Sequence, residues 1–245
     1  MRTPDADAAP IERELRAAGS PSRAASEQTY LKSSLEFAGT TVPVTRAIVT
    51  GWRRAHPDLQ RTQLIGLASN LWERPLFECR MAAVSLLTDR RRLLSADDAA
   101  LVERFLRTAR TWALVDGLAA DVMGSLVERF PELLSVIDRW AADDDFWLRR
   151  SAILALLVPL RRGDLGSWDR FAGYADGMLA EREFFIRKAI GWVLRETAKK
   201  HPDLIAEWLA PRVHRASGVT LREAVRWLPA ATRRALLAQR SGRES

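Results

Sequence analysis

A tryptophan and an aspartate stand four residues apart in the stretch RTWALVDGLA, at Trp112 and Asp116. Residues at positions i and i+4 of a helix project from the same face. An indole attracts cations and stacks on bases or sugars, and each such contact contributes about 0.5–2 kcal/mol. The pair therefore predicts a helix face that presents an aromatic ring beside a carboxylate.

The stretch EFFIRKAIGWVLRE, residues 183–196, predicts a helix with two dissimilar faces. One face carries Lys188, Trp192 and Arg195, because these positions are three and four residues apart. The other face is apolar and suited to packing, with Ile186, Ile190, Val193, Leu194 and Thr197. Cations on the first face would follow phosphates, so this face predicts sequence-independent, salt-sensitive binding to nucleic acid.

The elements that must hold these residues are helices. Helical periodicity runs through almost the whole chain after residue 10, without strand alternation. The strings HPDL, FPEL and HPDL recur at about twice a period of 36 residues, and each is predicted to open a helix. The helices that follow them, or lie midway, align over residues 77–87, 146–157, 184–194 and 220–228.

This repeat predicts an all-α, HEAT-like helical-repeat solenoid whose successive second helices line a concave basic face. Chance similarity among amphipathic helices is the alternative. In the repeat register, Asp116 takes the position held by Arg150 and Lys188 in later repeats. A polyanion would repel a carboxylate that stands in a row of cations facing it, so a carboxylate at this position indicates a specific function. The alternative for Asp116 is an ion pair with a neighbouring arginine.

Composition narrows the class of protein. The 245 residues carry a net charge of +7 with a pI near 10.4, which favours nucleic acid over an anionic membrane as the partner. Cys79 is the only cysteine and the three histidines are scattered, so no metal and no cofactor is expected. No apolar run is long enough for a signal peptide or a membrane span. We expect a cytoplasmic monomer with one domain over residues 11–240, a flexible lead at 1–10 and a flexible tail at 241–245.

Four stretches resemble one family over about residues 11–230: residues 183–196, TWALVDGLA (111–119), FWLRRSAIL (146–154) and TYLKSSLEFAG (29–39). They are similar to the AlkD family of bacterial alkylpurine DNA glycosylases, which has a HEAT-like fold. The resemblance implies a catalytic cluster of Trp112, Asp116 and Trp192. It also implies positions near the DNA backbone, at Tyr30, Arg150 and Arg195. Lys188 joins the DNA-binding set from its place on the helix face alone.

The same resemblance implies the reaction. A purine alkylated at N3 or N7 is cationic, and its N-glycosidic bond is weakened; the bond would be hydrolysed in duplex DNA without extrusion of the base. Asp116 would stabilise the positive charge that develops on the deoxyribose. With no evident lysine for Schiff-base chemistry, the enzyme is expected to be monofunctional. One departure from the family pattern is Ala113-Leu114, which is more apolar than expected.

Two other interpretations stay open. The same chemistry would serve a self-resistance glycosylase that removes bulky adducts of a DNA-alkylating natural product. From a different class, a non-catalytic HEAT-repeat protein would bind nucleic acid through the same basic face, and a protein-binding scaffold comes third. Release of a modified base from DNA separates the enzyme from both binding proteins.

Overall fold

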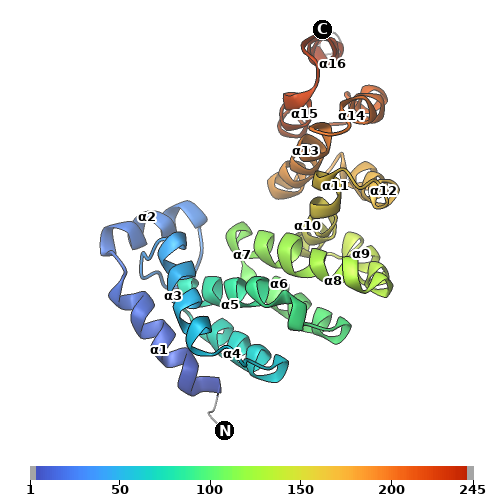
Figure 1. Cartoon of the computed structure of the whole chain (residues 1–245). Helices are drawn as coiled ribbons and strands as arrows, with labels where there is room; N and C mark the ends of the chain where they lie inside the picture. The colour runs from blue at the N-terminus through green and yellow to red at the C-terminus, as the bar shows by residue number, and fades with distance from the viewer. Residues whose placement is uncertain (1–3, 242–245) are drawn as a thin grey trace. The chain divides into compact units, whose positions relative to one another are not determined.

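The computed structural model describes residues 4–241, with the side chains of residues 7–240. Over this range the chain forms helices and no β-strand, and a single bridge joins Glu36 to Leu76. The prediction of an all-α fold is confirmed. Contacts divide the chain into two compact units, unit 1 (Met1–Phe130) and unit 2 (Pro131–Ser245), whose helices are labelled in Figure 1.

Unit 1 contains the first eight α-helices and three short helical segments of other types. Its elements are α1 (Pro4–Ala17), α2 (Pro21–Leu31), α3 (Val42–Ala55), α4 (Arg61–Glu73), α5 (Phe77–Asp89), η1 (Arg91–Leu93), η2 (Ala96–Asp98), α6 (Ala99–Ala109), α7 (Trp112–Asp116), the π-helical η3 (Gly117–Met123) and α8 (Gly124–Arg129).

Unit 2 contains the remaining helices. Its elements are η4 (Pro131–Leu133), α9 (Leu134–Ala141), α10 (Phe146–Ala155), α11 (Leu157–Arg162), α12 (Trp168–Met178), α13 (Phe184–Ala198), α14 (Pro202–Leu209), η5 (Ala210–Arg212), α15 (Gly218–Ala224), η6 (Val225–Trp227) and α16 (Ala230–Ser241).

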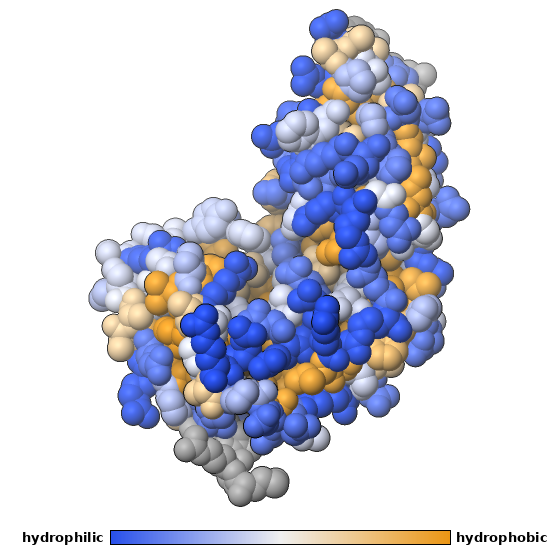
Figure 2. All heavy atoms as spheres, in the orientation of Figure 1, coloured by the Kyte–Doolittle hydropathy of each residue, from blue (hydrophilic) through white to orange (hydrophobic). Residues whose placement is uncertain are grey.

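One central helix organises each unit. In unit 1, α5 contacts α1, α3, α4 and η3, and in unit 2, α13 contacts α10, α11, α14 and α15. A helix that is covered on several sides must be apolar over most of its circumference. Both helices meet this requirement, since nine of the thirteen residues of α5 and nine of the fifteen residues of α13 are buried. The face seen in Figure 2 is largely hydrophilic in each unit, with smaller hydrophobic patches.

The repeated sequence positions have the same structural role in each repeat. The small residue of the pattern is fully buried in all four aligned helices, at Ala82, Ser151, Ala189 and Ala224. Small side chains let neighbouring helices approach closely, so a repeat that stacks on the next one needs them at this point. The aligned helices coincide with α5, α10, α13 and the segment formed by α15 and η6.

In three of the four aligned helices the repeated arginine donates a hydrogen bond to a backbone carbonyl. Arg80 donates to the carbonyl oxygen of Thr108 at 2.7 Å, and Arg187 donates to that of Glu181 at 2.6 Å. Arg149 donates to two carbonyl oxygens in residues 143–144 and forms a bidentate pair with Glu181, with both bonds at 3.0 Å. These three arginines therefore stabilise the fold by joining neighbouring segments, and they are not unpaired surface cations.

The helix boundaries differ from the predictions in two places. Pro202 begins α14 and Pro131 begins the short segment η4, but Pro57 lies in a turn and α4 begins only at Arg61. Of the predicted lead, residues 4–10 belong to α1, because Ala8 continues the buried spacing of Ile11 and Leu15. Residues 1–3 and 242–245 lie outside the described part, so most of the predicted tail does as well.

Candidate functional site

Trp112 follows a turn whose backbone conformation is uncommon. Thr111 is extended at the start of α7, and Arg110, which ends α6, has a φ of 54°. Besides Arg110, only Lys32 (φ 48°) has a positive φ among the described non-glycine residues. Such conformations cost about 1–3 kcal/mol and persist only where the surroundings enforce them, often at functional sites. Arg110 lies two residues before Trp112, and Lys32 lies two residues after Tyr30.

Tyr30 contacts Trp112 directly. Their ring centroids are 6.2 Å apart with an interplanar angle of 88°, so the contact is T-shaped. Tyr30 is 72% exposed, and α2, which carries it, has no buried residue of its own. The start of α2 is held instead by backbone contact, since a Cβ at Gly19 would lie 2.2 Å from the carbonyl oxygen of Ala38. Tyr30 and Trp112 thus form an accessible, T-shaped aromatic pair.

Asp116 ends α7 at the point where the helix changes from α to π. It is half-buried and lies one turn from Trp112, as the i, i+4 spacing predicted. The next residue, Gly117, fixes the position of this turn against α5: a Cβ there would lie 2.7 Å from Cγ1 of Val84. Single-turn π segments occur frequently at functional sites. We call Tyr30, Trp112 and Asp116 the unit 1 cluster.

Arg150, on α10, is buried, with only 2% of its surface exposed. Its Nη1 donates to the carbonyl oxygen of Phe185, and its guanidinium carbon lies 5.9 Å from the centroid of the Phe185 ring. The contact ties α10 to the first turn of α13 and engages one of the five donors of the guanidinium. The first turn of α13 therefore covers Arg150, which is not an exposed cation. A contact with the DNA backbone stays a prediction that requires close approach.

The two predicted faces of α13 are confirmed. The five residues assigned to the apolar face are fully buried. On the opposite face, Phe184 is 49% exposed, Lys188 and Lys199 are exposed, and Trp192 and Arg195 are half-buried. Lys188 lies with its Nζ 5.9 Å from the centroid of the Phe184 ring. We call these five exposed and half-buried residues the α13 face.

Carboxylates neutralise part of the charge on the α13 face. Arg195 pairs with Glu223 from α15 and with Glu196, and Lys199 pairs with Glu196 at 2.8 Å. Arg161 also approaches Glu196, at 3.4 Å. Burial raises the pKa of Glu196, but the hydrogen bond from Lys199 and the surrounding cations outweigh it and lower the pKa overall. In the described chain Lys188 has no carboxylate partner, so it is the most available cation of the face.

Close backbone contact places Glu223 beside Arg195. A Cβ at Gly191 would lie 2.8 Å from Cβ of Glu223 and 3.1 Å from the carbonyl oxygen of Thr220, so only glycine lets α15 approach α13 this closely. Thr220 also donates its hydroxyl to the carbonyl oxygen of Arg187 at 3.0 Å. Trp192 directly follows Gly191, so this close contact between α13 and α15 holds the backbone on which Trp192 stands.

From the sequence alone we also expect six further tryptophans to pack inside the protein: Trp52, Trp72, Trp140, Trp168, Trp208 and Trp227. Trp72, Trp140 and Trp208 are buried, as predicted. Trp227 is 54% exposed, so that prediction is wrong. Its segment, η6, ends the last aligned repeat, and the amphipathic pattern alone does not tell which side of a terminal helix stays open.

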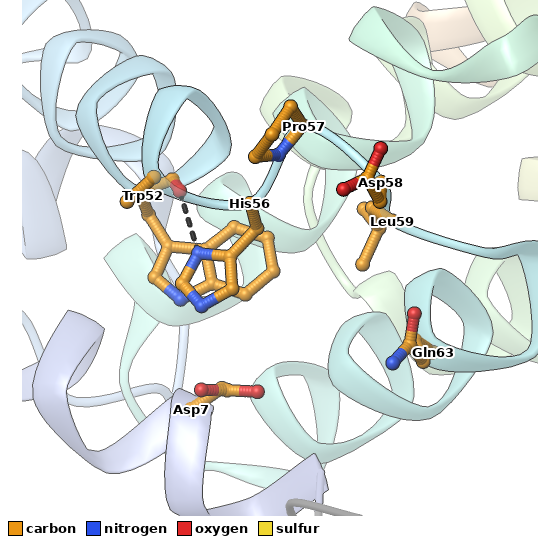
Figure 3. A pocket seen from close by; sticks show the side chains of 8 residues that line it. Asp7, Trp52, His56, Pro57, Asp58, Leu59 and Gln63 are labelled. Carbon is orange, nitrogen blue, oxygen red and sulfur yellow. Dashed lines mark hydrogen bonds between the residues drawn. The ribbon is translucent and has the colours of Figure 1, made fainter.

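Unit 1 contains a cavity of about 340 Å³ that is separate from the unit 1 cluster. Figure 3 shows Trp52 and His56, whose stacked rings have centroids 4.1 Å apart, with Asp7 opposite them. Within the described residues no group of His, Cys, Asp and Glu is arranged to hold a metal ion. Cys79 is buried, which raises the pKa of its thiol to about 12. No described helix has the length and apolar character needed to cross a membrane.

Comparison with family profiles assigns the chain to one family. The family profile described as "DNA alkylation repair enzyme" matches residues 11–228, so the chain belongs to the DNA alkylation repair enzyme family. No curated protein matches it. A predicted DNA alkylation repair enzyme from Enterococcus faecalis is 23% identical with a TM-score of 0.77, and the match covers 86% of this chain and 97% of that one. AlkD2 from Streptococcus mutans is 16% identical with a TM-score of 0.61, covering 78% and 91%. At these identities the structures show the shared all-α helical-repeat fold.

Proposed function

We propose that this DNA alkylation repair enzyme is a monofunctional DNA glycosylase for purines alkylated at N3 or N7. The observation that carries the proposal is the unit 1 cluster: a carboxylate, an indole and a phenol in accessible positions of a chain whose net charge is +7. The α13 face supplies a second indole, at Trp192, and the available cation Lys188.

The reaction follows from the charge of the substrate. An N3- or N7-alkylated purine is positively charged, so when the bond from C1′ to the purine nitrogen breaks, the base takes the electron pair and leaves neutral. Positive charge then develops on the deoxyribose. The Asp116 carboxylate would stabilise this charge and orient a water molecule, which adds to C1′ and gives up a proton. Trp112 and Trp192 would hold the cationic nucleotide through their ring faces.

Phosphate contacts would come from cations outside the reacting centre. Lys188 is exposed, and Arg195 and Arg150 lie deeper, with Glu223 and the Phe185 carbonyl as their neighbours. Lysine and arginine that neutralise phosphates give affinity that falls with salt and does not depend on base sequence. Tyr30, beside Trp112, would lie along the backbone near the damaged nucleotide.

We infer that the base stays in the duplex. An enzyme that extrudes a base needs a close-fitting pocket for it. The cavity of unit 1 is lined by Trp52, His56 and Asp58 among others, and by no residue of the unit 1 cluster. Contacts with the sugar and backbone are enough for the reaction, because the cationic base is already a good leaving group. This mode would also accept bulky adducts.

The test is base release from methylated duplex DNA, with the released purines identified chromatographically. The wild-type chain should release 3-methyladenine or 7-methylguanine. Asp116→Asn should lose about 100-fold or more of the rate, since removal of one group that stabilises a transition-state charge costs about that much. Its affinity for DNA should equal or slightly exceed that of the wild type, because a repelling charge is gone.

The matched control is Asp97→Asn, which makes the same change at an exposed position of unit 1 and should keep the wild-type rate. Wild-type activity in Asp116→Asn would reject the catalytic assignment. Binding of DNA without release of any base would make the chain a DNA-binding helical-repeat protein. A covalent complex trapped with borohydride would contradict the monofunctional mechanism.

A further inference from the structure

Trp227 occupies the position of Trp192 in the following repeat. The two residues are 35 positions apart, which is one repeat, and they align within the segments 184–194 and 220–228. In a solenoid, equivalent positions of successive repeats lie on the same surface. Trp227 is 54% exposed, whereas an indole that serves only to pack is normally buried. Its exposure therefore needs a reason.

A lysine of the α13 face covers the ring of Trp227. Nζ of Lys199 lies 5.6 Å from the ring centroid, within the range of a cation–π contact. The same Nζ donates to Glu196 at 2.8 Å, so two contacts hold it in place. Phe184 and Lys188 form a similar pair at the other end of α13. The contact between Lys199 and Trp227 thus extends the α13 face onto η6.

The surroundings of Trp227 are basic. Arg222 and Arg226 are exposed and close to it in the sequence, on α15 and on η6, and Lys199 lies over its ring. The nearby carboxylates are already engaged: Glu223 pairs with Arg195, and Glu196 is only 7% exposed among three cations. An apolar protein partner would leave these cations desolvated and unpaired, at a cost. A polyanion that also offers apolar surface complements them.

We propose that Trp227 and Lys199 form a second DNA contact, which binds the sugar–phosphate backbone of undamaged nucleotides beside the lesion. The proposal rests on the proposed function. Neighbouring helices pack about 8–10 Å apart, and DNA rises 3.4 Å per base step, so this contact lies about three steps from that of Trp192. It contributes affinity and no chemistry, because the carboxylate in the position equivalent to Asp116, Glu223, is neutralised by Arg195.

The test measures DNA binding by the full-length protein. For undamaged duplex DNA, fluorescence anisotropy should show that Trp227→Ala binds about five- to tenfold more weakly, as expected for the loss of one aromatic contact. Trp227→Phe should retain most of the affinity, because it keeps an aromatic face. The matched control is Leu165→Ala, which removes another exposed apolar side chain of unit 2 and should bind like the wild type. Hydroxyl-radical footprints should shorten by about three nucleotides at one end in Trp227→Ala.

Base release at saturating protein should be unchanged in Trp227→Ala, which separates this contact from the catalytic cluster. Wild-type affinity together with a full-length footprint would overturn the inference and leave the proposed function intact. So would a change in oligomeric state without a change in DNA affinity, because Trp227 would then bind a second copy of the chain. If the wild-type chain released no base from methylated DNA, the proposed function would fail, while binding to undamaged DNA would still test Trp227.

Discussion

Gly117 is the position at which the fold controls the placement of Asp116, and a single methyl group tests this. In Gly117→Ala the new Cβ would lie 2.7 Å from Cγ1 of Val84, whereas ordinary contact begins at 3.4 Å, so a shift of at least about 0.7 Å is needed. Val84 has a branched, buried side chain and few alternative rotamers. The turn that carries Asp116 must therefore move away from α5.

The shift should affect the rate more than the stability. Alanine is favoured over glycine in a helix by about 1 kcal/mol, and overpacking costs about 1–3 kcal/mol, so the net destabilisation should be about 0–2 kcal/mol. A displacement of about 1 Å at a reacting centre costs about 100-fold in rate. We expect base release by Gly117→Ala to slow by about 10- to 100-fold. The assays are single-turnover release at saturating protein and thermal unfolding.

A second substitution makes the cause specific. Val84→Ala removes the obstructing methyl groups, so the double variant Val84→Ala/Gly117→Ala should return to within about threefold of the rate of Val84→Ala alone. Val84→Ala by itself should lose stability, by about 1–3 kcal/mol, but keep its rate. An unimpaired Gly117→Ala, or a double variant as slow as Gly117→Ala, would refute the reasoning that this contact positions Asp116.

Three further predictions concern the charges and the exposed ring. Lys188→Gln should reduce the slope of log K for DNA binding against log[salt] by about 0.9, as expected for one lost phosphate contact. Arg195→Gln should reduce this slope less, because Arg195 is already paired with Glu223. Equal slopes for the two variants in a salt titration would contradict this prediction. Tyr30→Ala should slow base release by about threefold or more while the melting temperature stays near that of the wild type, since α2 buries no side chain; a large drop in melting temperature would mean a structural role. Glu196→Gln should lower the free energy of unfolding by about 1–2 kcal/mol at neutral pH. Because folding lowers the pKa of Glu196, this stabilisation is present above about pH 4.5 and is lost as the pH falls through the lowered pKa. Chemical denaturation at a pH below the lowered pKa should therefore give the same free energy of unfolding for Glu196→Gln and the wild type.

Local patterns predicted the helices and their faces well. The three- and four-residue spacing in residues 183–196 predicted which side of α13 is buried, and Ile186 and Ile190 are fully buried. The spacing of Trp112 and Asp116 likewise placed both on one turn. These predictions succeed because a single helix determines which of its residues share a face, and apolar residues fill the side that packs.

The sequence did not predict how distant residues change each charge. Arg195 looks like an available cation until Glu223, 28 positions later, is brought beside it by the close approach at Gly191. Arg150 looks exposed until the first turn of α13 covers it. Trp227 looks buried by analogy with other tryptophans. Each outcome depends on a neighbouring repeat, and the pattern within one helix contains no information about that neighbour.

The repeated arginine has a consequence for the composition as a whole. Arg80, Arg149 and Arg187 each fasten a helix to a carbonyl oxygen, and Arg149 closes on several acceptors with one planar group. Lysine has the same charge but not this flat, multi-pronged geometry. A version of the chain with lysine at every arginine would keep its net charge of +7, but it would lose the bidentate pair of Arg149 with Glu181 and the fixed planar geometry at Arg80 and Arg187. Its rigidity would decline before its attraction for a polyanion did.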